Sequence, residues 1–165
     1  MTLSMKEIRA EVLESGGKTP LLRVKELGER FPNSVALRNK EFGIWNEISY
    51  SEFWNRCTYV ASALINFGVK KGEKVAVHSE NRPEWFISDL GIQAAGAVTV
   101  GLYPTNPKSE VEYLLGHSET VILFAEDQEQ VDKAIDVISE LPDLVKIVYF
   151  EPRGLSNYDN EKLMS

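Results

Sequence analysis

The chain has 165 residues, of which 43% are hydrophobic and 26% charged, so it can bury a core of ordinary size and is not a disordered or fibrous segment. Its formal net charge of −7 disfavours binding to nucleic acid or to anionic membranes. Because Cys57 is the only cysteine, an internal disulfide and a cysteine-based metal site are both excluded.

These properties favour a reducing, cytoplasmic location, either in solution or at the membrane periphery. The first sixteen residues carry too many charges for a signal peptide. Because no apolar run approaches the ~20 residues of a spanning helix, we expect no integral membrane segment.

The chain is expected to begin with two helices. Ser4 and Glu7 have the spacing of a capping box, which predicts a short helix that ends before Gly17. Thr19 followed by Pro20 predicts the start of a second helix, which ends at Pro32-Asn33.

Two short runs rich in strand-forming residues follow, at 35–38 and 44–50, and the residues between them predict a hairpin loop. Trp45 in the second run is expected to need cover by other residues. Ser51 is predicted to cap the next helix, which ends near Gly68. Cys57 lies on the apolar face of that helix, which indicates a buried small residue rather than a reactive thiol.

The centre of the chain, residues 72–107, has the pattern of a strand at 75–77, a crossover helix and a parallel strand at 98–102. Asn81 is predicted to cap the helix, with Pro83 in its first turn. Apolar residues occupy nearly every side of this helix, which predicts burial on more than one face. Asp89 interrupts them, so it must lie at an edge or accept a hydrogen bond, and no catalytic role is assigned to it.

The same alternation continues to the end of the chain. Asn106 is predicted to cap a helix that starts at Pro107, and Asp127 with Gln130 is predicted to cap another. Strands are predicted at 121–124 and 144–150, whereas the residues beyond 151 are turn-rich. The fold class is therefore α/β, a mostly parallel sheet with helices on both faces, preceded by a β-hairpin.

The usual chemical motifs are missing. Gly96 and Gly101 are spaced like the glycines of a phosphate loop, but the lysine and the hydroxyl residue that should follow are not there. No strand leads into G-x-G-x-x-G, and no serine lies in a nucleophile elbow. His78 and His117 are too far apart for a local metal site, so hydrogen-bonded histidines are favoured over ligands. No catalytic, cofactor-binding or metal-binding residue is assigned.

Ligands of parallel sheets bind at the carboxyl ends of the strands, which points to two loops, 78–82 and 103–106. The candidate contact residues in these loops are His78, Asn81, Arg82, Tyr103 and Thr105. Arg82 could meet an anion there, but pairing with Glu80 or Glu84 is favoured.

Three stretches of the chain resemble a known family: RNKEFGIWNEISYSEFW, GEKVAVHSENRPEWFISDLGIQAAGAVTVGLYPTNP and EVEYLLGHSETVILFAED. They are similar to the beginning of adenylate-forming (AMP-binding) enzymes, specifically the AMP-forming long-chain fatty acyl-CoA synthetases. Residues 48–53 and 92–105 resemble the first two core motifs of that superfamily. The likeness extends from about Thr19 to Pro152.

The resemblance implies a two-step reaction, in which a fatty acid and ATP form an acyl-adenylate with Mg2+, and the sulfur of CoA then displaces AMP. It also implies that residues 1–18 are an extension, 19–152 an α/β subdomain of a larger N-terminal domain, and 153–165 a linker before the family's phosphate loop. ATP, Mg2+ and CoA are implied for a full-length enzyme, with no cofactor site in this fragment. The fragment is expected to be inactive alone, and a homodimer is a hypothesis.

Two rival interpretations stay open. A non-catalytic α/β binding or regulatory module would use the same layers and would show saturable ligand binding by itself. The N-terminal piece of another adenylate former, amino-acid-activating or luciferase-like, would begin in a similar way. The length of the acyl chain is not encoded in these residues.

Overall fold

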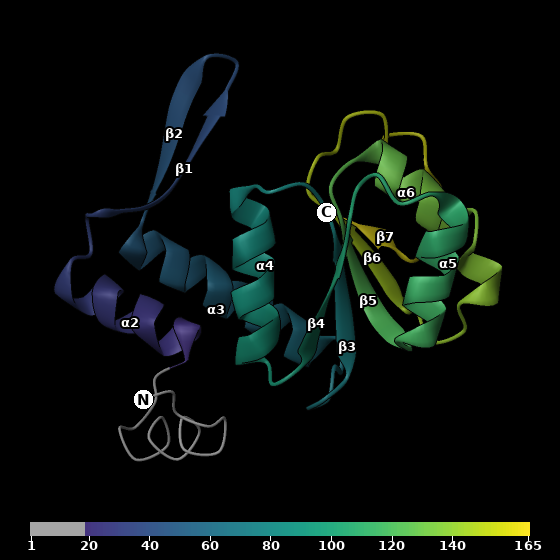
Figure 1. The fold of residues 1–165 in the computed structure, drawn as a ribbon, viewed down its shortest axis with the longest axis horizontal. Coiled ribbons are helices and arrows are strands. Elements are labelled where there is room, and N and C mark those ends of the chain that lie inside the picture. Colours follow the sequence, from purple (N-terminus) through teal and green to yellow (C-terminus); the bar gives the residue numbers. More distant parts are fainter. Residues whose placement is uncertain (1–18) are drawn as a thin grey trace, which may run out of the picture.

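A computed structural model describes residues 19–165 and contains a five-stranded parallel sheet with helices on both faces. The strand order is β4-β3-β5-β6-β7, and a separate antiparallel hairpin, β1-β2, precedes the sheet in the chain. In Figure 1 helices α3 and α4 lie on one side of the sheet and α5 and α6 on the other. The predicted fold class is confirmed. The helix predicted from Ser4 and Glu7 lies outside the described residues.

The first described half contains two helices and the hairpin. Its elements are α2 (Pro20–Arg30), β1 (Val35–Glu41), β2 (Ile44–Ser49) and α3 (Tyr50–Asn66). Strand β1 is longer than predicted, because the loop shrinks to a two-residue turn in which Phe42 and Gly43 both have positive φ. Strand β2 ends one residue earlier than predicted. Ile48 is buried, but Trp45 remains 58% exposed, so residues 19–165 do not provide the cover expected for Trp45.

The central unit is β3 (Lys74–His78), α4 (Pro83–Ala94) and β4 (Val98–Leu102). Leu90 of α4 packs in one apolar cluster with residues of α2 and α3, and Ile92 packs in another against the sheet. The helix is therefore buried on more than one face, as predicted, although Phe86 is 43% exposed. Asp89 was expected to lie at an edge or to accept a hydrogen bond, and it accepts one from Gln93 Nε2 at 2.9 Å.

The second half continues the alternation. Its elements are α5 (Lys108–His117), β5 (Thr120–Ala125), α6 (Gln128–Ile135), the 3-10 helix η1 (Ile138–Glu140), β6 (Lys146–Tyr149) and β7 (Leu163–Met164). The last strand was not predicted. It pairs parallel to β6, with Ile147 opposite Leu163, because the loop after residue 151 returns the chain to the sheet.

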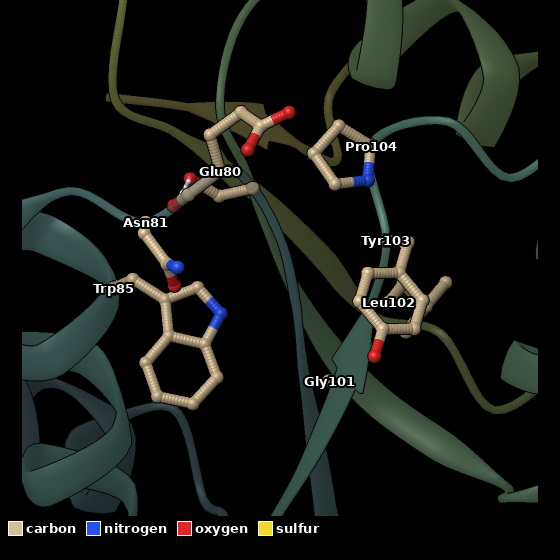
Figure 2. Close-up of a pocket in the computed structure, with 8 residues that line it drawn as sticks. Glu80, Asn81, Trp85, Gly101, Leu102, Tyr103 and Pro104 are labelled. Carbon is tan, nitrogen blue, oxygen red and sulfur yellow. Dashed lines mark hydrogen bonds between the residues drawn. The ribbon is translucent and has the colours of Figure 1, made fainter.

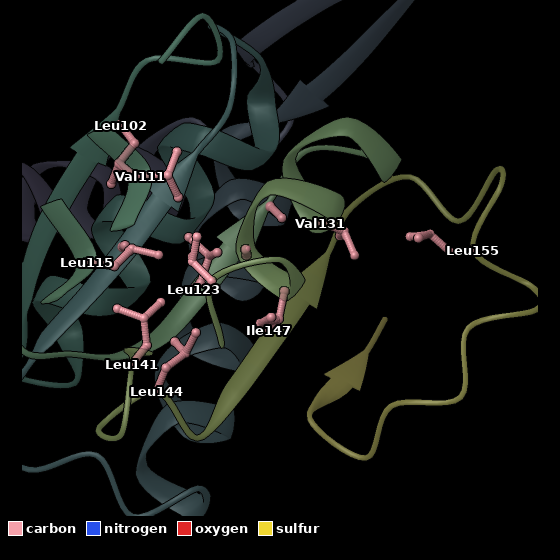
Figure 3. Close-up of a cluster of buried hydrophobic side chains, with 13 residues drawn as sticks. Leu102, Val111, Leu115, Leu123, Val131, Leu141, Leu144, Ile147 and Leu155 are labelled. Atoms are coloured by element: carbon pink, nitrogen blue, oxygen red, sulfur yellow. The ribbon is translucent and has the colours of Figure 1, made fainter. Parts of the chain in front are cut away.

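Two apolar clusters sandwich the sheet. The larger, on the α5 and α6 side, is drawn in Figure 3 and combines sheet residues such as Leu123 and Ile147 with Val111, Leu115 and Val131. The smaller, on the α3 and α4 side, contains the buried side chains Leu64, Val75, Val77, Ile92 and Ile122. Alternate residues of β3 therefore face opposite clusters, as the pleat of a strand requires.

Helix caps differ from prediction at three of the helix starts. Ser49, not Ser51, caps α3 by accepting from the Glu52 amide at 3.2 Å. Arg82 and Pro107, not Asn81 and Asn106, occupy the N-cap positions of α4 and α5, and neither makes a side-chain cap hydrogen bond. The helix predicted to start at Thr19 does so, and Thr19 also caps it. Asp127 caps α6 as predicted, although the side-chain oxygen of Gln130 makes no hydrogen bond.

Candidate ligand site at the carboxyl edge of the sheet

A cavity of about 290 Å³ opens where β3 and β4 end. One side, here called the first wall, consists of residues 79–81 and Trp85; the other, the second wall, consists of Tyr103 and Pro104. In Figure 2 the rings of Trp85 and Tyr103 lie on opposite sides of the opening. Gly101 leaves the floor as bare backbone, and a Cβ there would lie 3.7 Å from the Trp85 ring. We call this cavity the edge slot.

The first wall is held by Glu126, which follows the last residue of β5. One oxygen of its carboxylate accepts from the Glu80 amide at 2.6 Å and from the Ser79 hydroxyl at 3.1 Å. The other oxygen lies 3.4 Å from a guanidinium nitrogen of Arg82. One partly buried carboxylate therefore collects three donors from a loop that has no regular secondary structure.

Arg82 is shared between two carboxylates. It donates to Glu84 at 2.7 Å as well as to Glu126, and its guanidinium lies 5.8 Å from the centre of the Phe150 ring. Partial burial alone would lower the pKa of Arg82, but its hydrogen bond with Glu84, followed by the charge of Glu126, raises that pKa above its ordinary value. The predicted pairing with Glu84 is observed, and the second partner is Glu126 rather than Glu80.

The second wall is held by His78 and Lys133. Nε2 of the fully buried His78 donates to the Tyr103 carbonyl at 3.1 Å, and the ammonium of Lys133 donates to the Pro104 carbonyl at 2.8 Å. Burial, and then the charge of Lys133, lower the pKa of His78 from 6.5 to about 4, so the ring is neutral at pH 7. Lys133 also pairs with Glu129 at 2.7 Å.

The five candidate contact residues have different environments. Asn81 and Tyr103 line the edge slot, and Tyr103 is 79% exposed. His78 is buried behind the slot and reaches it only through its hydrogen bond to Tyr103. Arg82 lines a neighbouring cavity, and Thr105 is exposed but is not part of the slot. Of the five candidate residues, only Asn81 and Tyr103 therefore line the edge slot.

Glu126 and Lys133 were missed by sequence reasoning. Glu126 lies 46 residues after Glu80, whose amide it accepts, and Lys133 lies 29 residues after Pro104. No local spacing connects such pairs. The only signal was the position of Glu126 directly after a strand, at the edge where ligands of parallel sheets are expected.

A second cavity, of about 500 Å³, separates the hairpin from this edge. Trp45 and Lys40 line its hairpin side, and Arg82, Phe86 and Glu126 line the opposite side. Its lining includes basic and acidic side chains, so the charges of the lining favour neither an anion nor a cation.

Metal ligands do not gather in the described residues, where no group of three or more His, Cys, Asp or Glu side chains could hold an ion. His117 ends α5, as predicted, and stacks on Tyr113 with the ring centres 5.3 Å apart. None of the helices between residues 19 and 165 has the length and apolar character needed to cross a membrane.

The model of the AMP-binding enzyme family matches residues 24–163. The chain is 32% identical over 128 residues to the long-chain-fatty-acid–CoA ligase FadD15 of Mycobacterium tuberculosis, covering 78% of this chain and 21% of that protein. It is 31% identical over 127 residues to the long-chain-fatty-acid–CoA ligase ACSBG2 of Xenopus laevis, covering 77% and 17%. The chain thus spans about a fifth of the length of these curated relatives.

Solved structures give the same grouping. The anthranilate CoA ligase AuaEII, in complex with anthranoyl-AMP, matches with a TM-score of 0.68 and 28% identity over 77% of this chain and 24% of that one. The acetoacetyl-CoA synthetase of Streptomyces lividans matches with a TM-score of 0.77 over 87% of this chain and 23% of that one, and at 20% identity this likeness concerns the fold alone.

Proposed function

Because the chain belongs to the AMP-binding enzyme family, whose model matches residues 24–163, we propose that it is the N-terminal portion of an ATP-dependent fatty acid:CoA ligase. The proposal is carried by one observation: the chain is 31–32% identical to curated long-chain-fatty-acid–CoA ligases. In the proposed reaction the fatty acid carboxylate attacks the α-phosphate of ATP, which releases pyrophosphate and leaves an acyl-adenylate. The CoA thiol then attacks the acyl carbonyl, and AMP leaves.

The chemistry of both steps depends on neutralising phosphate charge and on holding the reactants in line for attack. Mg2+ would supply part of that charge. Arg82 is already engaged by two carboxylates, and Lys133 is engaged by a carbonyl and by Glu129, so neither is free to bind a triphosphate. We therefore assign the residues of this chain a scaffolding and substrate-positioning role and propose that phosphate binding requires further polypeptide.

The proposed contribution of this chain is the edge slot. Its opening lies at the carboxyl ends of β3 and β4, which is where ligands bind in open parallel sheets. Asn81 offers an amide, and Trp85 and Tyr103 offer aromatic surface. We propose that Asn81 and Tyr103 contact substrate and that His78 acts through the Tyr103 carbonyl.

The proposal is tested with the product of the complete reading frame and with the 165-residue chain. Palmitate, ATP, Mg2+ and CoA are supplied, and the release of AMP and the formation of palmitoyl-CoA are measured. We expect sustained turnover by the complete product and none by the 165-residue chain. A complete product that releases no AMP with any fatty acid would overturn the ligase assignment, and turnover by the 165-residue chain would overturn the scaffolding role.

A second candidate is a ligase for aromatic acids, because the AuaEII structure is an anthranilate CoA ligase at 28% identity. Replacing palmitate by anthranilate in the same assay separates the two. A non-catalytic binding module is separated by calorimetry on the 165-residue chain. Saturable MgATP binding would support that module, whereas we expect none.

A further inference from the structure

The two walls of the edge slot are braced from one short segment that does not line it. Glu126 precedes α6 and holds the first wall, whereas Lys133 lies within α6 and holds the second wall through the Pro104 carbonyl. Neither side chain is among the residues that line the slot. We call residues 126–133 the brace segment.

The brace segment is itself fixed to the sheet. The Glu126 amide donates to the His78 carbonyl at 3.0 Å, and the Glu126 carbonyl accepts from the Glu151 amide at 2.9 Å. Asp127 caps α6 by accepting from the Glu129 amide at 2.9 Å. The side chain of Glu126 therefore starts from backbone that is bonded to neighbouring segments on both sides, so it can hold a loop in one place.

The side-chain hydrogen bonds that run from the brace segment to the walls all involve a charged group. The Glu126 carboxylate accepts from the Glu80 amide, and the Lys133 ammonium donates to the Pro104 carbonyl. The side chains of Glu126 and Lys133 are only 19% and 18% exposed. Charge-assisted hydrogen bonds with little access to water are stronger than neutral ones, so each can order a loop that lacks regular structure.

We propose that Glu126 and Lys133 are positioning residues for the edge slot: Glu126 fixes the first wall through Glu80 and Arg82, and Lys133 fixes the second wall through Pro104. This deepens the proposed function and rests on it, because the slot is the part of the chain assigned to substrate. In this proposal the shape of the slot depends on two side chains that do not line it. Each wall has its own anchor, so each can be loosened alone.

The test is amide hydrogen exchange of the 165-residue chain, read at Glu80 for the first wall and at Asn106 for the second. The Asn106 amide donates to the Tyr103 carbonyl at 2.9 Å and so reports on the backbone next to Pro104. In Glu126→Ala we expect exchange at Glu80 to be about tenfold faster, because a hydrogen bond to a charged group is lost, while Asn106 and Leu123 in strand β5 keep their rates.

Lys133→Met should give the opposite pattern, with faster exchange at Asn106 and no change at Glu80. Lys133→Arg, which keeps a cationic donor, should restore the rate at Asn106, which a role in packing alone would not do. Glu126→Gln keeps one acceptor for the Glu80 amide and should have a smaller effect than Glu126→Ala, and this variant serves if the alanine protein does not fold. Glu29→Gln removes an exposed carboxylate 3.9 Å from Lys25, away from the slot, and should alter neither wall.

Unchanged exchange at Glu80 in both Glu126 variants would overturn the proposal. Equal acceleration of all amides, including Leu123, would overturn it too, because it would show a general loss of stability. These readouts involve no ligand and no turnover. A negative result in the ligase assay therefore does not affect the interpretation of the exchange rates. Unchanged exchange rates would likewise not count against the ligase assignment.

Discussion

The imidazole of His78 is fully buried at the end of β3 and is held neutral there. Burial, and then the charge of Lys133, lower its pKa from 6.5 to about 4. The unfolded chain therefore binds a proton more readily than the folded chain between these two values. The contribution of His78 to stability is fully present above about pH 6.5 and is lost as the pH falls towards about 4.

The difference between pKa 6.5 and about 4 corresponds to about 3 kcal/mol in the free energy of unfolding. We expect urea unfolding of the chain to show this loss between about pH 7 and about pH 4, on top of the loss from carboxylates. His78→Gln keeps a donor for the Tyr103 carbonyl but does not titrate, so its stability should fall less over the same range. Parallel pH profiles for the two proteins would contradict this assignment.

At the scale of single helices, two nearby serines could cap α3, and only Ser49 does so. Ser49 accepts from the Glu52 amide, whereas Ser51 lies inside the first turn. Ser49→Ala should lower the free energy of unfolding by about 1 kcal/mol, because one orphan amide of the helix start loses its partner. Ser51→Ala should change it by less than about 0.5 kcal/mol. Chemical denaturation of both variants measures the difference, and a larger loss in Ser51→Ala would restore the cap predicted from sequence.

The contact between α3 and α4 depends on the missing side chain of Gly91. A Cβ at this position would lie 2.5 Å from Val60 Cγ1 and 3.0 Å from the Cys57 carbonyl oxygen. Gly91→Ala should therefore lower the free energy of unfolding by about 1–3 kcal/mol, although alanine is the better helix former. The matched control is Gly116→Ala in α5, where a Cβ would meet only Leu141 at 3.7 Å and should stabilise by up to about 1 kcal/mol. Thermal unfolding of both variants tests the contrast in sign.

Periodicity predicts the elements themselves well and their ends less well. The predicted strand at 98–102, the helix start at Thr19 and the cap at Asp127 agree with the structure, because local pattern determines them. Asn81 lies two residues before Pro83, and Asn106 lies directly before Pro107, so both look like caps. Each helix nevertheless begins one residue later than that interpretation requires. Strand β7 has two residues and forms only because β6 is next to it, so no local pattern announces it.

The candidate site shows the same division between local and long-range information. The rule for parallel sheets predicts which edge carries the loops, and both slot walls lie there. It does not predict which residues hold them, because Glu126 and Lys133 are distant in sequence from Glu80 and Pro104. Charged side chains in a linear sequence look alike whether they are solvated or anchor a loop.

At the scale of the whole molecule, the two faces of the sheet are covered unequally. Helices α5 and α6, together with Leu141, Leu144 and Leu155 of the connecting segments, enclose one face in the larger apolar cluster. On the other face a groove of about 330 Å³ remains beside α3 and α4. Its lining is mostly apolar and includes Tyr59, Ile87, Phe124, Val148 and Phe150. Exposed apolar patches of this kind favour association, because contact removes them from water.

We therefore expect the 165-residue chain to self-associate through this groove, and sedimentation velocity at several protein concentrations measures it. Val148→Lys should weaken association by about tenfold or more, because the ammonium would have to lose its water in the contact. Tyr113→Lys, which alters an exposed side chain on α5 on the opposite face of the sheet, should leave association unchanged. Sedimentation as a monomer at every concentration would contradict the expectation, and equal weakening by both substitutions would move the contact away from the groove.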